Sequence, residues 1–294
     1  MTKRPLFGGD ALVRAMILGL PFAVILILIV GPLVLTFVIS FWQKTGFTMR
    51  PDLTLDNYAA FFSGVRLEVL LRSLWVAFSA TILMIVIAYP IAYLITTRLR
   101  EVLVRPVLFL FAVPFLVNYV VRTFAWSDLL SRTGPINSAL IAFGITERPL
   151  DWLLFSDFAV YLGLITAYMP FMVFPIWLSL SGIDRRLVEA SWLLGEGPFT
   201  TFRRVILPLS LPGVIAAAIF GFVGAFGEVA VSLILGGTGY QLLGNAIQSA
   251  LSVLNYPLAA AISSVSTLLM LALIVAWYQF FDLRLMLGKI MMRA

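Results

Sequence analysis

The chain has 294 residues, of which 62% are hydrophobic and 12% are charged, whereas about a quarter of the residues in a soluble globular domain carry a charge. It contains no cysteine and no histidine, which excludes disulfides, thiolate nucleophiles, histidine-based triads and ordinary zinc sites. The net charge is +6, but the basic residues lie in short clusters between apolar runs, as in the cytoplasmic loops of membrane proteins. The composition predicts an all-α integral membrane protein and disfavours nucleic-acid binding.

Long uncharged stretches predict six transmembrane helices, since one crossing takes about 20 residues. The expected ranges, in chain order, are 16–42, 70–97, 105–126, 158–181, 211–233 and 260–282. The first apolar stretch is longer than the core of a signal peptide and lacks a small-residue cleavage site, which predicts a retained helix. Segments 43–68 and 128–157 are expected to be outer loops with short interfacial helices, and the Gly-rich segment 235–245 is expected to be the start of the loop before the last helix.

The distribution of basic residues predicts how these helices are oriented. Of the 20 Lys and Arg residues, 13 fall on one side of the arrangement, in the N-terminal segment and in the segments near 100, 184–204 and 284–293. The positive-inside rule places that side in the cytoplasm, together with both termini. We therefore expect a multi-pass protein of a bacterial inner membrane, in contact with lipid and forming a single transmembrane domain over 1–294.

The chain holds no nucleotide-binding loop of its own. No G-x-x-x-x-G-K-[ST] sequence occurs in it, and six spans leave no room for an ATPase domain. We therefore expect no bound cofactor, and any energy from ATP has to come from another chain.

The segment 181–214, between the fourth and fifth predicted helices, is expected to form a helical hairpin on the cytoplasmic side. Asp184 is a suitable N-cap for a short helix that Gly195 ends, and Thr200 or Thr201 is a suitable cap for a second helix. Composition alone favours an amphipathic hairpin held on anionic lipid by four arginines.

The spacing within this hairpin favours a more specific interpretation. Glu189-Ala190-Ser191, three further residues, Gly195, nine further residues and then Val-Ile-Leu207-Pro208 resemble the E-A-A, x3, G, x9, I-x-L-P signature of ABC-importer permeases. The resemblance implies a type I importer permease fold whose coupling loop, about 182–208, docks in a groove of a separate cytoplasmic ATPase. The residues it assigns to ATPase coupling are Glu189, Ala190, Ser191, Gly195, Leu207 and Pro208. The chain departs from the signature at Ser191 and in the turn Gly195-Glu196-Gly197-Pro198, which leaves the role of Glu196 open.

Further segments resemble the permeases of spermidine/putrescine importers along nearly the whole chain. These segments are TLDNYAAFF (54–62), VPFLVNYVVRTFAW (113–126), YMPFMVFPIW (168–177), LLGNAIQ (242–248) and YPLAAA (256–261). The resemblance implies alternating access for polyamines, driven by ATP and Mg bound to two copies of an ABC ATPase. It also implies a second, homologous permease and a periplasmic binding protein. Permeases for opines, phosphonates or ferric ion share these features and remain alternatives.

Glu228 is the one acidic residue expected well inside a span, where a lone charge costs roughly 3 kcal/mol unless it faces a polar cavity or a partner. One interpretation makes it the counter-charge for a cationic amine on the translocation path. The other makes it a structural group that pairs with Arg122, with backbone groups or with the partner permease. Both remain open.

Other candidates for the path lie near the outer end of the third predicted helix. Asn118 and Arg122 share one helical face, and Tyr119 and Trp126 offer aromatic faces to an alkylammonium, as do Tyr168 and Trp177 farther along the chain. Interfacial anchoring explains many Trp and Tyr residues equally well, and an arginine on the path would repel a cation.

Two other classes of function fit the sequence less well. An ion-coupled secondary transporter usually shows internal repeats and several intramembrane carboxylates. A membrane-embedded enzyme needs a nucleophile and a base, and without His or Cys none can be assembled here. No residue is therefore assigned a catalytic or metal-binding role, and the chain is expected to be a transport subunit rather than an enzyme.

Overall fold

The computed structural model describes residue 19 and residues 21–280 and divides the chain into two compact units. The first unit comprises residues up to 64 together with 247–271, and the second comprises 65–246 together with residues from 272 onward. The outermost residues of the first and last predicted spans, and the basic residues near both termini, lie outside the described residues. Helices α13 (Leu243–Ser252) and α14 (Tyr256–Phe280) run from one unit into the other.

The membrane-spanning character of the chain is clear from its helices. Five described helices are long and apolar enough to cross a membrane, and a sixth span results if one bent helix pair is counted as a single crossing. The predicted six-span fold is thereby confirmed, with a break in the third span.

The first unit contains the first span, Pro21–Ile39, which includes the π-helical turn η1 (Leu26–Val30) and α2 (Gly31–Ile39). A short antiparallel hairpin of β1 (Gln43–Thr45) and β2 (Thr48–Arg50) follows, with Gly46 at positive φ in its turn. The helix α3 (Asp56–Phe62) corresponds to the interfacial helix expected in this loop, whereas the strands were not predicted. Asn57 Nδ2 donates to the carbonyls of Ser40 at 3.0 Å and Trp42 at 2.8 Å, which holds α3 against the end of the span.

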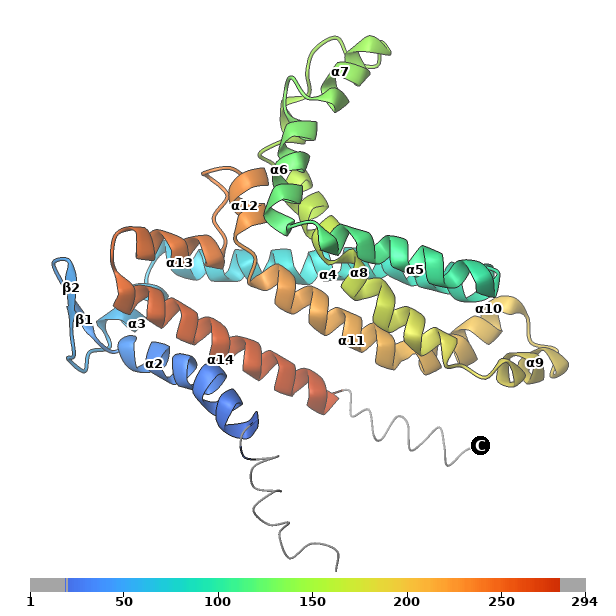
Figure 1. Cartoon of the computed structure of the whole chain (residues 1–294), viewed down its shortest axis with the longest axis horizontal. Coiled ribbons are helices and arrows are strands. Elements are labelled where there is room, and N and C mark those ends of the chain that lie inside the picture. The colour runs from blue at the N-terminus through green and yellow to red at the C-terminus, as the bar shows by residue number, and fades with distance from the viewer. Residues whose placement is uncertain (1–18, 20, 281–294) are drawn as a thin grey trace, which may run out of the picture. The chain divides into compact units, whose positions relative to one another are not determined.

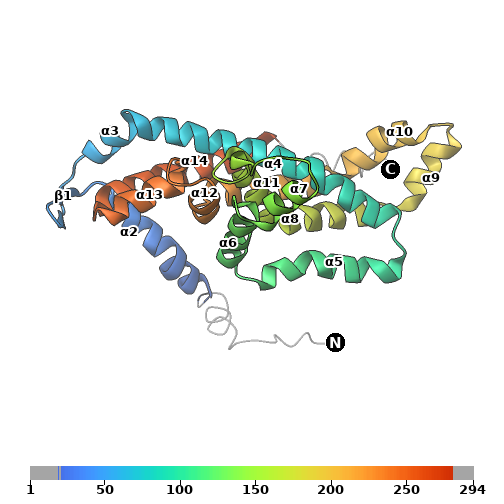
Figure 2. The ribbon, with the colours of Figure 1, turned by 90° about the horizontal axis from the view of Figure 1, so that it is seen from above.

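The second unit is built on three helices that lie side by side, α4 (Val65–Thr97), α8 (Asp157–Ser181) and α11 (Leu207–Phe226) (Figures 1 and 2). Small residues let their backbones approach closely, as is usual between membrane helices. A Cβ added at Gly213 would lie 2.4 Å from the carbonyl oxygen of Pro175, and one at Gly221 would lie 2.7 Å from the sulfur of Met172. On α4 the contact face consists largely of fully buried alanines, namely Ala77, Ala80, Ala88 and Ala92.

The third span is broken rather than continuous. It consists of α5 (Glu101–Leu116) followed by α6 (Tyr119–Leu130), and the chain turns by 90° between them (Figure 1). An unbroken helix over 105–126 was therefore wrong. The Asn118 side chain accepts the N–H of Val120 at 2.9 Å, so it caps a new helix instead of continuing the old one.

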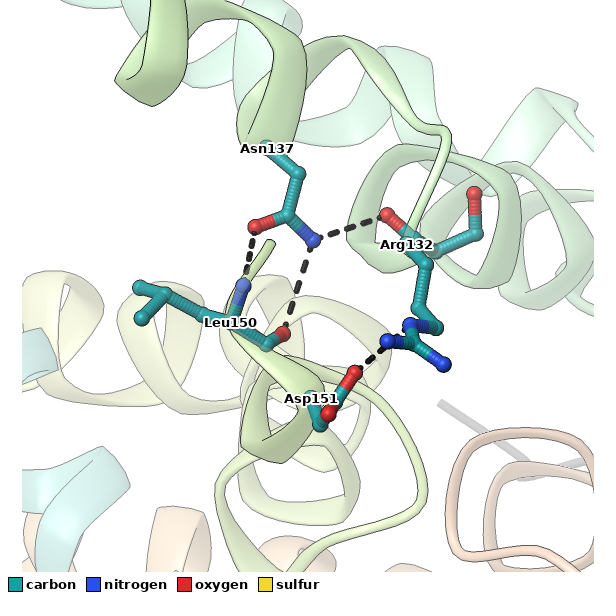
Figure 3. A network of polar contacts seen from close by, with 5 residues as sticks. Arg132, Asn137, Leu150 and Asp151 are labelled. Atoms are coloured by element: carbon teal, nitrogen blue, oxygen red, sulfur yellow. Dashed lines mark hydrogen bonds and ion pairs between the residues drawn. The ribbon is translucent and has the colours of Figure 1, made fainter. Parts of the chain in front are cut away.

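The loop after α6 is folded by a small polar network (Figure 3). It contains α7 (Pro135–Ala142) and the 3₁₀ turn η2 (Asp151–Leu153), which agrees with the short helices expected there. Asn137 is fully buried; its Nδ2 donates to the Ser131 carbonyl at 3.0 Å, and its Oδ1 accepts the Leu150 N–H at 2.7 Å. Beside it, Arg132 Nε and Asp151 Oδ1 form an ion pair at 2.7 Å. One amide side chain thus joins the two ends of the loop.

The fifth span differs from its prediction at both ends. It begins in the hairpin, because α10 (Pro198–Thr201), the π-helical turn η3 (Phe202–Ile206) and α11 form one span of 29 residues. At the other end α11 stops at Phe226, and a separate short helix, α12 (Ala230–Leu235), follows Gly227 and Glu228. Residues 211–233 are therefore not one helix.

Candidate functional site

The hairpin between α8 and α11 forms largely as its sequence predicts. Helix α9 (Arg185–Leu193) starts at Asp184, whose Oδ1 accepts the N–H of Arg186 at 2.9 Å. Gly195 adopts φ 80°, a conformation that favours glycine, and the N–H of Glu196 returns to the carbonyl of Ser191 at 3.2 Å. The sequence therefore stops α9 where the signature places its glycine.

The second helix of the hairpin starts earlier than predicted. Its N-cap is Gly197, with Pro198 in the first turn, and neither Thr200 nor Thr201 caps it. Thr201 is instead buried, and its hydroxyl lies 2.9 Å from the hydroxyl of Ser191. This bond joins α9 to α10 and gives a structural reason for a serine at that position of the signature. Glu196, whose role was open, pairs with Arg204 at 2.7 Å.

The outer face of the hairpin is unusually apolar for a loop. Large hydrophobic side chains are exposed along it, namely Leu187, Trp192, Leu193, Leu194 and Phe199, with Leu193 exposed to 88%. Of the predicted coupling residues, Glu189, Ala190 and Gly195 are exposed beside them, Ser191 is buried, and Leu207 and Pro208 are half-buried in the first turn of α11. Contiguous apolar surface of this kind is typical of a surface that contacts a protein or a membrane.

A cavity of about 740 Å³ lies between the hairpin and the adjoining ends of α4, α5 and α8. Glu189 lines it together with Arg98, Glu101, Arg185 and Trp177. Trp177, one of the predicted aromatic faces, is therefore near the hairpin and far along α8 from Tyr168.

A second cavity, of about 550 Å³, lies where the two broken spans meet α8. The break between α5 and α6 contributes Asn118, Tyr119 and Arg122 to it, and the break between α11 and α12 contributes Glu228. Three of the four residues predicted for the path, together with Arg122, are thus brought together. Trp126 is half-buried one turn beyond Arg122 and is not among the lining residues.

The Glu228 carboxylate is fully engaged at the break. Its Oε1 accepts the backbone N–H groups of Val229, Ala230 and Val231 at 3.1, 2.9 and 3.1 Å. Its Oε2 accepts the hydroxyl of Tyr168 at 2.7 Å, and the residue is only 5% exposed. Pairing with backbone groups is one of the structural roles considered from the sequence, and the contact with Tyr168 was not foreseen. The pairing leaves the carboxylate's negative charge at the cavity wall.

Arg122 lines the same cavity. Its Nη1 donates to the carbonyl of Pro114 at 2.8 Å, and its guanidinium carbon lies 6.0 Å from the centre of the Phe115 ring. The Pro114 carbonyl also accepts the N–H of Val117 at 3.3 Å, so the arginine adds a second, shorter bond to a carbonyl at the end of α5. Arg122 pairs with the end of α5 and not with Glu228. The break between α5 and α6 is therefore bridged by Arg122, and the break between α11 and α12 is bridged by Glu228.

Comparison with known proteins places the chain in a family. Residues 83–286 match the family described as "Binding-protein-dependent transport system inner membrane component", and the chain belongs to it. It is therefore a multi-pass inner-membrane permease of an ABC importer, and a transport component rather than an enzyme.

Curated relatives resemble the chain over most of its length. The spermidine/putrescine transport system permease protein PotB of Salmonella typhimurium is 35% identical over 86% of this chain and 92% of its own. PotB of Escherichia coli is 36% identical over 79% of this chain and 87% of its own. A subunit in the crystal structure of a bacterial ABC transporter that imports the acidic polysaccharide alginate has a TM-score of 0.74 at 15% identity, over 92% of this chain and 95% of that one. The last likeness shows the fold alone.

Proposed function

We propose that this chain is a permease subunit for linear polyamines such as spermidine and putrescine, and that it forms half of a translocation path that works by alternating access. The observation that carries the proposal is the similarity to curated spermidine/putrescine permeases, at 33–36% identity over most of the chain. The carboxylate of Glu228 and the aromatic side chains at the second cavity supply chemistry that suits an alkylammonium group.

The partners follow from the same proposal. A second, homologous permease completes the path, two copies of a cytoplasmic ABC ATPase bind ATP and Mg, and a periplasmic protein delivers the substrate. The exposed apolar face of the hairpin, with Glu189 and Gly195 on it, is the surface that we assign to the ATPase. Lipid surrounds the spans. No role for nucleic acid is proposed.

The charge of the hairpin also supports a proposed orientation in the membrane. Its four arginines face the cytoplasm under the positive-inside rule, and both termini lie on the same side. The β1–β2 hairpin and the loop around α7 then face the periplasm.

The experiment is reconstitution of the complete complex in liposomes with the binding protein outside and ATP inside. We expect spermidine or putrescine to be taken up and to stimulate ATP hydrolysis, whereas a neutral diol of the same length, as a matched control, does neither. Stimulation by an anionic solute but by no polyamine would contradict the proposed substrate. Uptake that needs an ion gradient but no ATP would contradict the proposed machine.

A further inference from the structure

Three phenylalanines form a row beside the second cavity: Phe115 and Phe171 line it, and Phe220 packs on Phe171 just outside the lining. The rings of Phe115 on α5 and Phe171 on α8 meet edge to face with their centres 4.4 Å apart. Phe171 and Phe220 on α11 are stacked, with centres 6.1 Å apart and planes at 24°. The three side chains remain 39%, 42% and 55% exposed, so their rings contact one another and still present faces outward.

This aromatic row is continuous with the carboxylate. Tyr168 lies one helical turn from Phe171 on α8 and donates its hydroxyl to Glu228. Its ring lies over Gly224, where an added Cβ would be only 2.3 Å from a ring carbon of the tyrosine. Gly224 is in turn one helical turn from Phe220 on α11. The facing helices α8 and α11 therefore bring a phenol and two phenyl rings together next to the acid that follows α11.

The chemistry of this row suits a flexible cation. Phenyl and phenol faces attract ammonium groups, at about 0.5 to 2 kcal/mol each, and they also cover methylene groups. The structure already places one cation in this environment, since the guanidinium of Arg122 lies 6.0 Å from the Phe115 ring. Arg122 is held by the Pro114 carbonyl at the α5 end of the row, which leaves the Tyr168, Phe171 and Phe220 end next to the only carboxylate of the cavity lining.

We propose that Phe171 and Phe220, with Phe115 at their side, form an aromatic lane that receives the methylene and ammonium groups of a linear polyamine beside Glu228. The inference rests on the proposed function, because it assigns the residues along which that substrate passes. A row of rings without fixed hydrogen bonds holds such a chain at several successive positions, and each position is weak enough to be left again.

Cysteine labelling tests the lane directly, because the natural chain has no cysteine. Single variants Phe171→Cys and Phe220→Cys are placed in the complete reconstituted complex and treated with a water-soluble maleimide, and labelling is read as a mass shift of this chain. Phe109→Cys is the matched control: Phe109 is 65% exposed on α5, the helix of Phe115, but it neither lines the cavity nor, unlike Phe220, packs its ring on a phenylalanine that does. We expect labelling at 171 and 220 and little at 109, where lipid rather than water is expected to cover the exposed side chain.

Spermidine supplies the second arm of the test. At four times its dissociation constant it should slow labelling at 171 and 220 about fivefold, since protection scales as one plus the ratio of ligand concentration to that constant. Absence of labelling at both positions, or labelling unaffected by spermidine in a complex that imports it, would overturn the lane and leave the proposed function standing. A wild-type complex that imports no polyamine would instead overturn the proposed function.

A conservative substitution checks that the rings matter as rings. Phe171→Leu keeps an apolar side chain and removes the π face, and we expect it to lower spermidine uptake about fivefold or more while assembly with the partner chains is unchanged. Phe171→Trp should restore uptake. Equal uptake by Phe171→Leu and by the control Phe109→Leu would contradict the lane.

Discussion

Replacement of Glu228 distinguishes its structural role, as the hydrogen-bond acceptor at the start of α12, from its proposed role as the counter-charge for a cationic substrate. Glu228→Ala leaves three backbone N–H groups at the start of α12 and the hydroxyl of Tyr168 without their acceptor. Loss of a helix N-cap costs about 0.5 to 2 kcal/mol, and each buried group left unsatisfied costs about 1 to 3 kcal/mol. Removing a buried charge returns part of this, so we expect a net loss of about 2 to 4 kcal/mol in the free energy of unfolding. Glu228→Gln keeps a carbonyl oxygen for the N–H groups and should lose only about 1 kcal/mol.

The assay measures thermal unfolding and uptake on the same preparations. At about 2 to 4 °C per kcal/mol, Glu228→Ala should unfold roughly 5 to 15 °C below the wild type, and Glu228→Gln within about 4 °C of it. We expect Glu228→Gln to assemble normally and to import a cationic substrate poorly, because only the charge is gone. Glu196→Ala is the control for the unfolding measurement alone, since its carboxylate pairs with the exposed Arg204 and such surface pairs contribute about 0 to 1 kcal/mol.

Two results would refute this reasoning. If Glu228→Ala unfolds at the wild-type temperature, the carboxylate does not hold the break between α11 and α12. If Glu228→Gln imports polyamine at the wild-type rate, the charge is not part of the path and the residue is a cap alone.

Four further substitutions and one control test other parts of the structure. Glu189→Ala and Gly195→Trp should weaken co-purification of the ATPase and uncouple its hydrolysis, the second because φ 80° strains any side chain there by about 1 kcal/mol or more; unchanged docking and coupling in both would remove the hairpin from the ATPase interface. Gly213→Leu should abolish folded protein in detergent, judged by gel filtration, since its first carbon already meets the Pro175 carbonyl, whereas Gly197→Ala, which meets nothing, should be tolerated. Asn137→Leu should make the loop 131–151 sensitive to added protease by removing about 2 to 4 kcal/mol of buried hydrogen bonds; equal resistance would show that the network does not hold the loop.

The six spans could be predicted from the length of the apolar runs, and the hairpin could be predicted from single residues that cap its first helix. Apolar runs of about 20 residues mark the crossings, and Asp184 and Gly195 mark the ends of α9 through cap chemistry that is local. The signature spacing then placed Glu189 and Gly195 on the exposed face of one hairpin, where the structure has them.

The breaks in the third and fifth spans could not be predicted in this way, because an apolar run has the same hydropathy whether or not the helix within it is broken. Their cues were weak in isolation: Pro114 and Asn118 precede α6, and Gly227 precedes Glu228. Each break is stabilised by contacts that are remote or specific in geometry, such as Arg122 to Pro114 and Tyr168 to Glu228, which lies 60 positions away. Glu228 and Arg122 line one cavity because of that folding, and nothing in either local sequence indicates it.

The fifth span joins the two candidate sites into one mechanical element. Its 29 residues run from Pro198, at the hairpin that we assign to the ATPase, to Phe226, two residues before Glu228. At 1.5 Å per residue this span is about 43 Å long. A tilt of about 5° about its hairpin end therefore displaces the other end by ~3.8 Å. A shift of that size exceeds the slack of any hydrogen bond. Under the proposed function, we therefore expect a motion that begins at the ATPase to reach the Glu228–Tyr168 contact along this span and to open or close that hydrogen bond.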